Sequence, residues 1–532
     1  MIPKSCVSPT GRFVWGVHQP HFTADNFRQN DYPALLGALP DGTRCSNTAN
    51  FPPGPVHEPS ADLVFEIPNA FPFRGTTYIG KKWADERALA PETIGLPKLP
   101  EVSFSSDYPD EQTAKAAISR LPRSLQLALA VTSTDARDLC ALAHHAALFC
   151  MDDGGQPWGL AYENANGRIR PRIVDEALFD AVANNFYLPG AYRQAMVLRP
   201  GAQGNSEIVG EWSRPNSHVF EYLRRNSYIP WGHYAANMAD DAVRYRASDL
   251  LPEDMAGLRH LYYQRTFTRL ARMLGLDVSA DRRELTADEL EYLRKQIQKR
   301  LAEGQQPLFN RTLWGWNYGF DYAPTGYRLH GSHQQIHQQY ALIPVSAASP
   351  DGEGKFPAYG CGDQIGAFVR DYRQETGKGF FECYEKAISG NQRMDQNPEG
   401  PSDLVVFEDE AVMVFVPKAQ TSQWELQIMP KTPVGNIVEA DTAMREALDR
   451  AIGIAITALA GLGARMVTCI EYPKAIDDPS TDQRLLMALM PRLPESPGTF
   501  SEAQLRWITG YYPEDVALAC RHQVAKKWAA AG

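Results

Sequence analysis

The strongest constraint on the fold is the order of patterns in residues 403–532, where short apolar runs flank one long helical pattern. Residues 403–418 (DLVVFEDEAVMVFVPK) predict two strands joined by an acidic turn, and residues 424–431 predict a third strand. Residues 442–463 carry apolar residues at helical spacing, and residues 484–494 form another apolar run of strand length. Strands followed by a crossing helix and a further strand predict an α+β sheet domain.

Similar patterns occur in the first part of the chain, separated by longer irregular stretches. Residues 61–73 (ADLVFEIPNAFPF) begin as an apolar run that prolines interrupt, which predicts a strand running into a turn. Residues 112–150 carry two amphipathic helical patterns, and Thr134 or Asp135 is suited to cap the second. Residues 151–230 are rich in Gly, Asn and Pro and favour no particular element.

Two well-marked helices are predicted in the middle of the chain. Residues 249–275 have apolar residues at helical spacing, and Gly275 supplies a C-terminal cap. Thr286 and Glu289 have the spacing of a capping box at the start of the next helical pattern. We therefore expect two consecutive helices ahead of the aromatic segment that begins near residue 313.

Composition and charge narrow the class of protein. Hydrophobic residues make up 44% of the 532 residues and charged residues 22%, which is typical of a soluble globular protein. The net charge of −10 gives no global electrostatic reason to expect nucleic acid as a partner. The sequence contains neither a signal-peptide pattern near residue 1 nor 18 consecutive apolar residues. These features predict a cytoplasmic protein without a membrane partner.

The eight cysteines are scattered along the chain without a C-x-x-C pair. This distribution argues against a structural zinc ribbon and against a disulfide framework. A reduced compartment is the simpler interpretation. We expect neither a bound metal nor an organic cofactor.

The segment from Ser332 to Tyr340 (SHQQIHQQY) carries the clearest chemistry in the sequence. If this segment is a strand, Gln335, His337 and Gln339 share one face, because alternate side chains of a strand point the same way. A histidine flanked by two amides suits phosphate chemistry, since the imidazole can attack phosphorus while the amides donate hydrogen bonds to phosphate oxygens. The pattern therefore predicts His337 as a nucleophile and Gln339 as its partner.

A different interpretation treats His330, His333 and His337 as metal ligands. Their spacing of three and four residues would put them on one face of a helix. Gly331 and the poor helix propensity of the preceding residues argue against a helix here. The strand interpretation is therefore preferred.

The motif resembles that of the histidine-triad superfamily, in its galactose-1-phosphate uridylyltransferase-like or nucleotide phosphorylase-like branch. That branch reads Ser-Asn-Pro-His-Pro-His-Gly-Gln, and its second histidine is the nucleophile. On this sequence, the nucleophile falls on His337, the final glutamine on Gln339 and the phosphate-contacting serine on Ser332. Gln335 replaces the first histidine, and His333 lies beside it as a further substrate-binding candidate.

Other segments resemble the same family in the same chain order. Residues 8–17 (SPTGRFVWGV) are similar to its Thr-Gly-x-Trp segment, and residues 62–73 to its Val-Phe-Glu-Asn-Asp-Phe strand. Residues 405–441 resemble the start of its second half. In the segment equivalent to its Leu-His-Ala-His, Met487 and Leu489 stand in for histidines, so the second half looks catalytically silent.

The resemblance implies an α+β fold of two histidine-triad-like halves, with antiparallel sheets and packed helices. Residues 1–74 would form an N-terminal arm and the first strands of the catalytic half, and residues 75–225 a large, mainly helical insertion. Residues 226–400 would complete the catalytic half with the active-site strand. Residues 401–532 would form the second, degenerate half.

The resemblance also implies a reaction, the transfer of a nucleoside monophosphate through a covalent histidine intermediate. The substrates would be a nucleotide or nucleotide sugar and a phosphorylated acceptor, as in sugar-1-phosphate nucleotidyl exchange or dinucleoside polyphosphate phosphorolysis. The family resemblance is compatible with a homodimer. A nucleotide hydrolase on the same scaffold and a non-catalytic nucleotide-binding or scaffold protein are the alternatives, because Gln335 departs from the motif.

Two further groups of residues have both a structural and a functional interpretation. Asn317 and Gly319, within WGWNYG, reproduce the Asn-x-Gly that the family carries ahead of its histidines, so Asn317 is a substrate-binding candidate. The aromatic residues around it suit a hydrophobic core equally well. His144 and His145 lie in an apolar helical pattern and are interpreted as structural.

Overall fold

The computed structural model describes most of the chain. The described residues are 5–27, 34–48, 51, 54–165, 168–196, 246–278, 283–321, 337–479, 482–494 and 498–531. Of these, the side chains of 165, 168–170, 337–340, 498–500 and 528–531 lie outside the description.

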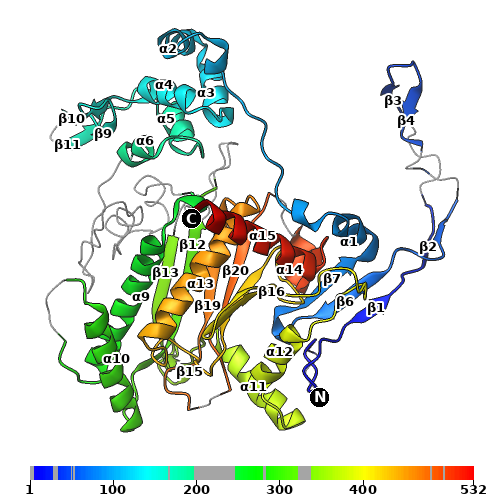
Figure 1. Ribbon diagram of the computed structural model, residues 1–532, viewed down its shortest axis with the longest axis vertical. Helices are drawn as coiled ribbons and strands as arrows, with labels where there is room; N and C mark the ends of the chain where they lie inside the picture. Colours follow the sequence, from blue (N-terminus) through cyan, green and yellow to red (C-terminus); the bar gives the residue numbers. More distant parts are fainter. Residues whose placement is uncertain are drawn as a thin grey trace.

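A seven-stranded antiparallel sheet forms the centre of the molecule (Figure 1). This sheet contains the aromatic segment at 309–319 and the strand that begins at His337, together with the strands predicted in residues 403–494. From one edge to the other, the strands are β13 (His337–Pro344), β12 (Phe309–Gly319), β19 (Met466–Tyr472), β20 (Leu486–Arg492), β18 (Leu426–Pro430), β17 (Val412–Phe415) and β16 (Val405–Glu408).

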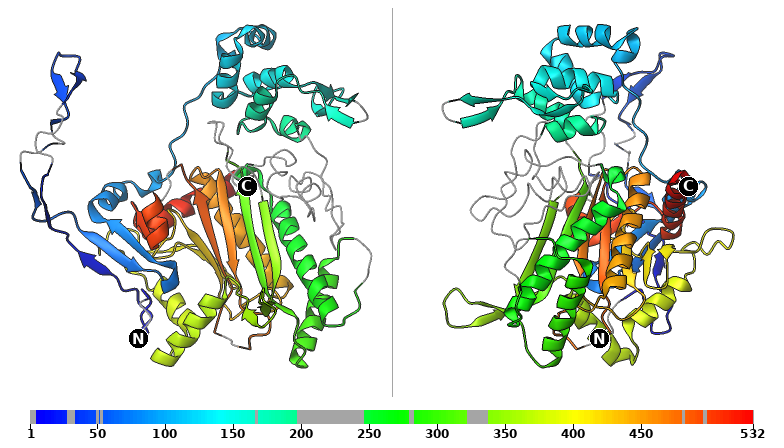
Figure 2. Two further views of the ribbon diagram at one scale, coloured as in Figure 1. Left: turned by 180° about the vertical axis from the view of Figure 1, so that it is seen from behind. Right: turned by 60° about the vertical axis from the view of Figure 1, so that its left-hand side comes forward.

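Long helices cover one face of this sheet, as Figures 1 and 2 show. Apolar residues of these helices and of the sheet form the largest core cluster, which includes Trp314 and Trp316 of β12. The helices are α9 (Pro252–Met273), α10 (Ala287–Ala302), α13 (Thr442–Gly461) and α15 (Pro513–Ala531). In α13, alanine and isoleucine recur at helical spacing, so one side of the helix packs on the strands.

A second layer covers part of the other face, on the side of β16, β17 and β18. It consists of α11 (Asp363–Thr376), α12 (Phe380–Ser389) and a small sheet in the order β1-β6-β7-β21. The strands of that sheet are β1 (Gly16–His18), β6 (Val64–Pro68), β7 (Thr76–Gly80) and β21 (Arg506–Thr509). Because β21 pairs in parallel with β7, the C-terminal segment completes a sheet begun by N-terminal strands.

Residues 111–196 form a separate lobe with its own apolar core (Figure 2). Its helices are α2 (Glu111–Arg120), α3 (Arg123–Thr132), α4 (Ala136–Ala146), α5 (Glu176–Ala183) and α6 (Gly190–Ala195). Two hairpins join them, made of β8 (Phe149–Met151), β9 (Pro157–Leu160), β10 (Tyr162–Ala165) and β11 (Arg168–Pro171). The lobe is attached to the main body through Phe186, whose ring lies 6.0 Å from that of Phe320, and through the Arg193–Asp249 ion pair.

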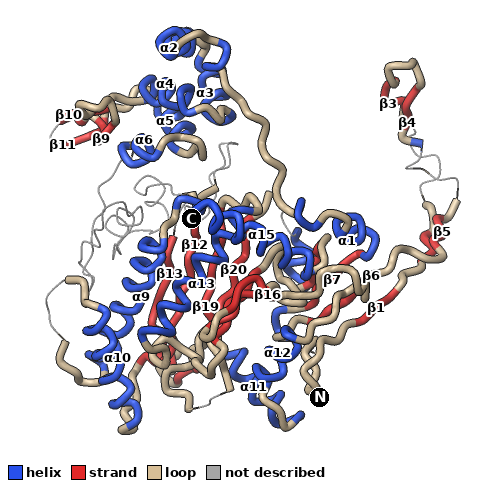
Figure 3. The backbone as a smooth tube through the Cα atoms, viewed as in Figure 1, coloured by secondary structure: helices blue, strands red, loops and turns tan. Residues whose placement is uncertain are grey.

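The remaining elements are short, as the backbone trace in Figure 3 shows. Helix α1 (Lys81–Ala88) follows β7, and α14 (Gly498–Gln504) precedes β21. Three small hairpins pair β2 (Phe22–Ala24) with β5 (Val56–Glu58), β3 (Leu35–Ala38) with β4 (Arg44–Ser46), and β14 (Ser346–Ala348) with β15 (Lys355–Pro357). Within the described ranges, no helix combines the length and the apolar character that crossing a membrane requires.

The structure confirms the α+β class and most of the predicted elements, and corrects one of them. The capping box of Thr286 and Glu289 is present, Asp135 caps α4, and Gly275 has a φ of 67° just after α9. The two helices expected in residues 112–150 are three, because Pro122 separates α2 from α3.

A buried charge cluster fixes α9 against the sheet and α13. Arg259 is fully buried, with its Nε 3.1 Å from Oδ1 of Asp449 and its Nη2 3.6 Å from Oε1 of Glu471. The Tyr263 hydroxyl also donates to Asp449, over 2.7 Å. Burial raises the pKa of Asp449 to about 6 and also raises the pKa of Glu471, and the Arg259 guanidinium opposes both shifts.

Replacing this guanidinium should strongly destabilise the protein. Arg259→Leu leaves Asp449 and Glu471 buried without a counter-charge, so we expect the free energy of unfolding to fall by about 3–5 kcal/mol. Urea denaturation at pH 7 measures this change. The control is Arg300→Leu, whose ion pair with Glu303 is exposed and should contribute less than about 1 kcal/mol.

A triple variant tests whether the lost stability reflects unpaired charge. Adding Asp449→Asn and Glu471→Gln to Arg259→Leu removes both stranded carboxylates and should recover part of the loss. Wild-type stability in Arg259→Leu alone would show that this cluster does not stabilise the fold.

Candidate functional site

The candidate nucleophile begins an edge strand of the main sheet. His337 is the first residue of β13, and in the antiparallel register with β12 its Cα partner is Asn317. Gln339 is paired with Gly315 in the same way. The strand expected from the sequence is therefore present from residue 337 onward, and it lies beside the segment that contains Asn317.

The aromatic residues of β12 alternate with these positions. Trp314, Trp316 and Tyr318 are buried in the core beneath the helices. Gly315 and Asn317 belong to the opposite face, because successive residues of a strand point to opposite sides of a sheet. The structure thus assigns the aromatic rings to the core and leaves Asn317 as the polar group of this segment.

Asn317 is held in place by the neighbouring strand on its other side. Its Cα partner on β19 is Thr468, whose hydroxyl donates to Oδ1 of Asn317 over 2.8 Å. Asn317 is 8% exposed. Because Thr468 occupies the amide oxygen, the Asn317 amide has a fixed orientation on the face opposite the helices.

The row of Cα partners continues across the sheet from Asn317 and Thr468 to Met490 on β20. A second row of Cα partners on the same face runs from Gly315 through Ile470 and Ala488 to Gln427 on β18. Both rows belong to the face that the long helices leave uncovered. This face therefore connects the candidate histidine strand with the centre of the sheet.

A buried polar cluster stands on this face near β18. Arg74 Nη2 lies 2.8 Å from Oε1 of Glu425 and donates to the Thr421 hydroxyl over 3.0 Å. Gln427 donates to Glu425 over 3.0 Å and accepts from the Tyr384 hydroxyl over 3.2 Å. This cluster could not be predicted from the sequence, because Arg74 and Glu425 are far apart in the chain and their local patterns predict only strands and turns.

The other site residues predicted from the sequence lie outside the part of the chain that the structure describes. Ser332, His333 and Gln335 lie in residues 322–336, and the side chains of His337 and Gln339 are among those outside it. The alternative metal site required a helix through His330, His333 and His337. His337 lies in a strand, and the other two histidines fall outside the described residues.

The second half-motif also has a defined register. Met487 and Leu489 are fully buried in the core beneath the helices. Leu486, Ala488 and Met490 of β20 lie on the opposite face, which is also the face of Asn317. Met487 and Leu489, which the sequence comparison aligned with the family's histidines, therefore do not lie on the face of Asn317. Nowhere in the described ranges do three or more His, Cys, Asp or Glu residues gather in a way that could hold a metal ion.

The two histidines of the lobe formed by residues 111–196, His144 and His145, have hydrogen-bond partners within that lobe. Nε2 of His144 lies 2.9 Å from the Tyr192 hydroxyl, and Nε2 of His145 lies 2.8 Å from the Ser119 hydroxyl. Burial lowers the pKa of His144. Both side chains join elements of the lobe to each other.

Sequence comparisons identify no relatives, whereas structural comparison gives distant neighbours. No model of a known protein family matches the sequence, and neither does any curated protein. Structural neighbours include a GalT-like protein from Arabidopsis thaliana, with 18% identity, a TM-score of 0.31, and coverage of 44% of this chain and 67% of that one.

Two other neighbours are similar at the same level. An ADP-glucose phosphorylase from Arabidopsis thaliana with bound ADP-glucose has 18% identity and a TM-score of 0.31, over 44% of this chain and 64% of its own. A uridylyltransferase has 13% identity and a TM-score of 0.32, over 46% and 69%. The chain thus spans about two thirds of the length of these proteins. They belong to the branch that the sequence motifs resemble, but likeness at this level assigns no function.

The hydrogen bond between Thr468 and Asn317 should contribute measurably to stability. Thr468→Val removes the hydroxyl with little change of shape, and we expect a loss of about 0.5–1.5 kcal/mol in the free energy of unfolding. A double-mutant cycle with Asn317→Ala measures the coupling directly. Strict additivity of the two changes would contradict this pairing, and Thr432→Val at an exposed position serves as the control.

Proposed function

We propose that the protein transfers a nucleoside monophosphate through a covalent intermediate on His337. The observation that supports the proposal is the pairing of His337 with Asn317 at the start of β13. This pairing brings the nucleophile and the amide, chosen separately from the sequence, to opposite positions on adjacent strands. Directly opposite residues of an antiparallel pair lie on the same face of a sheet.

The proposed reaction has two displacements at one phosphorus atom. In the first, an imidazole nitrogen of His337 attacks the α-phosphorus of the nucleotide donor. The N–P bond forms as the P–O bond to the leaving phosphate breaks, and the leaving group keeps the electron pair. In the second, a phosphate oxygen of the acceptor attacks the same phosphorus, the N–P bond breaks, and the histidine is regenerated.

The neighbouring polar groups would stabilise the charge that develops on the phosphate. Gln339, two residues along β13, would donate its amide hydrogens to a non-bridging oxygen or to the leaving group. The Asn317 amide, whose oxygen accepts a hydrogen bond from Thr468, would contact the phosphate from β12. Ser332, Gln335 and His333 complete the proposed set on the strength of the sequence motif.

Gln335 at the position of the first histidine has a chemical consequence. A neutral amide can donate a hydrogen bond to a phosphate oxygen, but it supplies neither positive charge nor a proton. We therefore propose a slower enzyme than one with both histidines. A hydrolase on the same scaffold would use water in the second displacement, and a non-catalytic nucleotide-binding or scaffold protein would perform neither step.

Covalent labelling tests the mechanism. The purified protein is incubated with nucleotide sugars or dinucleoside polyphosphates labelled at the α-phosphorus, without an acceptor. The expected product is nucleotidylated protein whose bond is labile in acid and stable in alkali, as a phosphoramidate is and a serine phosphoester is not. Peptide mapping should locate the label on His337.

Two variants and a control separate chemistry from folding. His337→Gly should abolish labelling, and Gln339→Ala should slow transfer by ~10²-fold or more if its amide stabilises the transition state. His522→Ala, at an exposed histidine of α15, should label like the wild type. Full turnover by His337→Gly with a verified substrate would refute the site assignment.

A further inference from the structure

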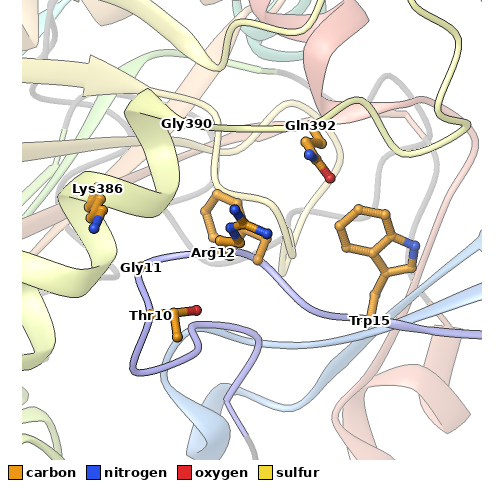
Figure 4. Close-up of a pocket in the computed structure, with 8 residues that line it drawn as sticks. Thr10, Gly11, Arg12, Trp15, Lys386, Gly390 and Gln392 are labelled. Atoms are coloured by element: carbon orange, nitrogen blue, oxygen red, sulfur yellow. The ribbon is translucent and has the colours of Figure 1, made fainter.

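A cavity of about 490 Å³ lies between the N-terminal segment and the end of α12, away from β13. Figure 4 shows Thr10, Arg12 and Trp15 on one side of it. Lys386 and Gln392 lie on the other side, and Phe13 also lines the cavity. The cavity thus combines two cationic side chains, two aromatic rings, a hydroxyl and an amide.

The N-terminal wall of the cavity is a closed turn. Ser8 and Arg12 are joined by a backbone hydrogen bond of 2.9 Å, and the Ser8 hydroxyl accepts from the Arg12 amide over 3.1 Å. Gly11 has a φ of 72°, and a Cβ there would lie 2.6 Å from Cδ of Lys386. The Lys386 stem therefore rests on the turn, and the exposed side chains of Arg12 and Lys386 both line the cavity.

The two cations at the cavity are not neutralised by the protein. Within the described part of the chain, neither the Arg12 guanidinium nor the Lys386 ammonium has a carboxylate within 4.0 Å. Lys418, in contrast, is fully buried and forms an ion pair with Glu514 over 2.5 Å. Its ammonium lies 4.8 Å from the centre of the Trp15 ring, which fixes that ring from the protein side.

We propose that this cavity binds a small phosphorylated molecule that also carries a planar ring, as a nucleoside monophosphate does. Arg12 and Lys386 would neutralise the phosphate, because a guanidinium and an ammonium without partners form charge-assisted hydrogen bonds with its oxygens. The ring would lie against Trp15 and Phe13. Thr10 and Gln392 would provide hydrogen bonds to the polar edge of the ligand.

This binding site is separate from the proposed catalytic one. Helix α12 packs on β17, with the rings of Tyr384 and Phe415 5.6 Å apart. Strand β17 stands five positions from β13 in the sheet, a distance of about 24 Å at the usual strand spacing. A single small ligand cannot span both, so the cavity would hold a second ligand whose binding does not require His337.

Protection from chemical modification tests the proposal at the cavity itself. In the His337→Gly protein, Lys386 is acetylated with and without UMP or AMP, and peptide mass spectrometry measures the extent. Either nucleotide should reduce the acetylation of Lys386. The acetylation of Lys378, an exposed lysine of the preceding loop, should stay unchanged. Arg12→Gln should weaken protection by about 10-fold or more, because it removes a charged hydrogen-bond donor. Lys378→Gln is the matched control and should have no effect.

Probes that lack either the phosphate or the ring show which of these two groups the cavity recognises. Uridine or adenosine alone should not protect, and inorganic phosphate should protect more weakly than the nucleotides. In Trp15→Leu, the nucleotides should protect Lys386 little better than inorganic phosphate does. Equal protection by inorganic phosphate, no protection by any probe, or unchanged protection in Arg12→Gln would each overturn the proposal. Because His337 is absent from the tested protein, these outcomes are independent of the labelling experiment.

Discussion

The pairing of β12 with β19 is the contact on which the rest of the sheet depends. It joins the strands at 309–344 to those at 405–492, over five consecutive Cα pairs from Gly315–Ile470 to Gly319–Met466. Gly319 has a φ of 80°, and a Cβ there would lie 2.0 Å from the carbonyl oxygen of Arg465, so only glycine fits at the end of this pairing. Without this junction, the hairpin that carries His337 would have no core to pack on.

On each side of the junction, helices of the same layer precede two adjacent antiparallel strands. Helix α9, followed by α10, precedes the β12–β13 hairpin, and α13 precedes the β19–β20 hairpin, with all three helices in the same layer. The charge cluster of Arg259, Asp449 and Glu471 joins these two sides, because Arg259 lies on α9, Asp449 on α13 and Glu471 on β19. The polar residues of the junction, Asn317 and Thr468, stand on the face opposite the helix layer.

Elements with local signals could be predicted from the sequence, whereas contacts between distant segments could not. Capping residues fix the starts of α4 and α10, and the hairpin of β16 and β17 follows from two apolar runs around an acidic turn. The strand that begins at His337 was also predictable, because alternation is a local property. The parallel pairing of β21 with β7 and the Arg74–Glu425 cluster join segments that are far apart in the chain, and no local pattern encodes them.

The position of the lobe formed by residues 111–196 follows from the same geometry. Its Phe186 ring packs on Phe320, the residue after β12, and lies 5.3 Å from the guanidinium carbon of Arg465, just before β19. These residues end the strands that carry Asn317 and Thr468, so the lobe is anchored at the end of the sheet where His337 begins β13. Since the lobe has its own core, it can vary in sequence without disturbing the sheet. The lobe is therefore anchored to one end of the sheet through these contacts, while its own fold rests on its separate apolar core.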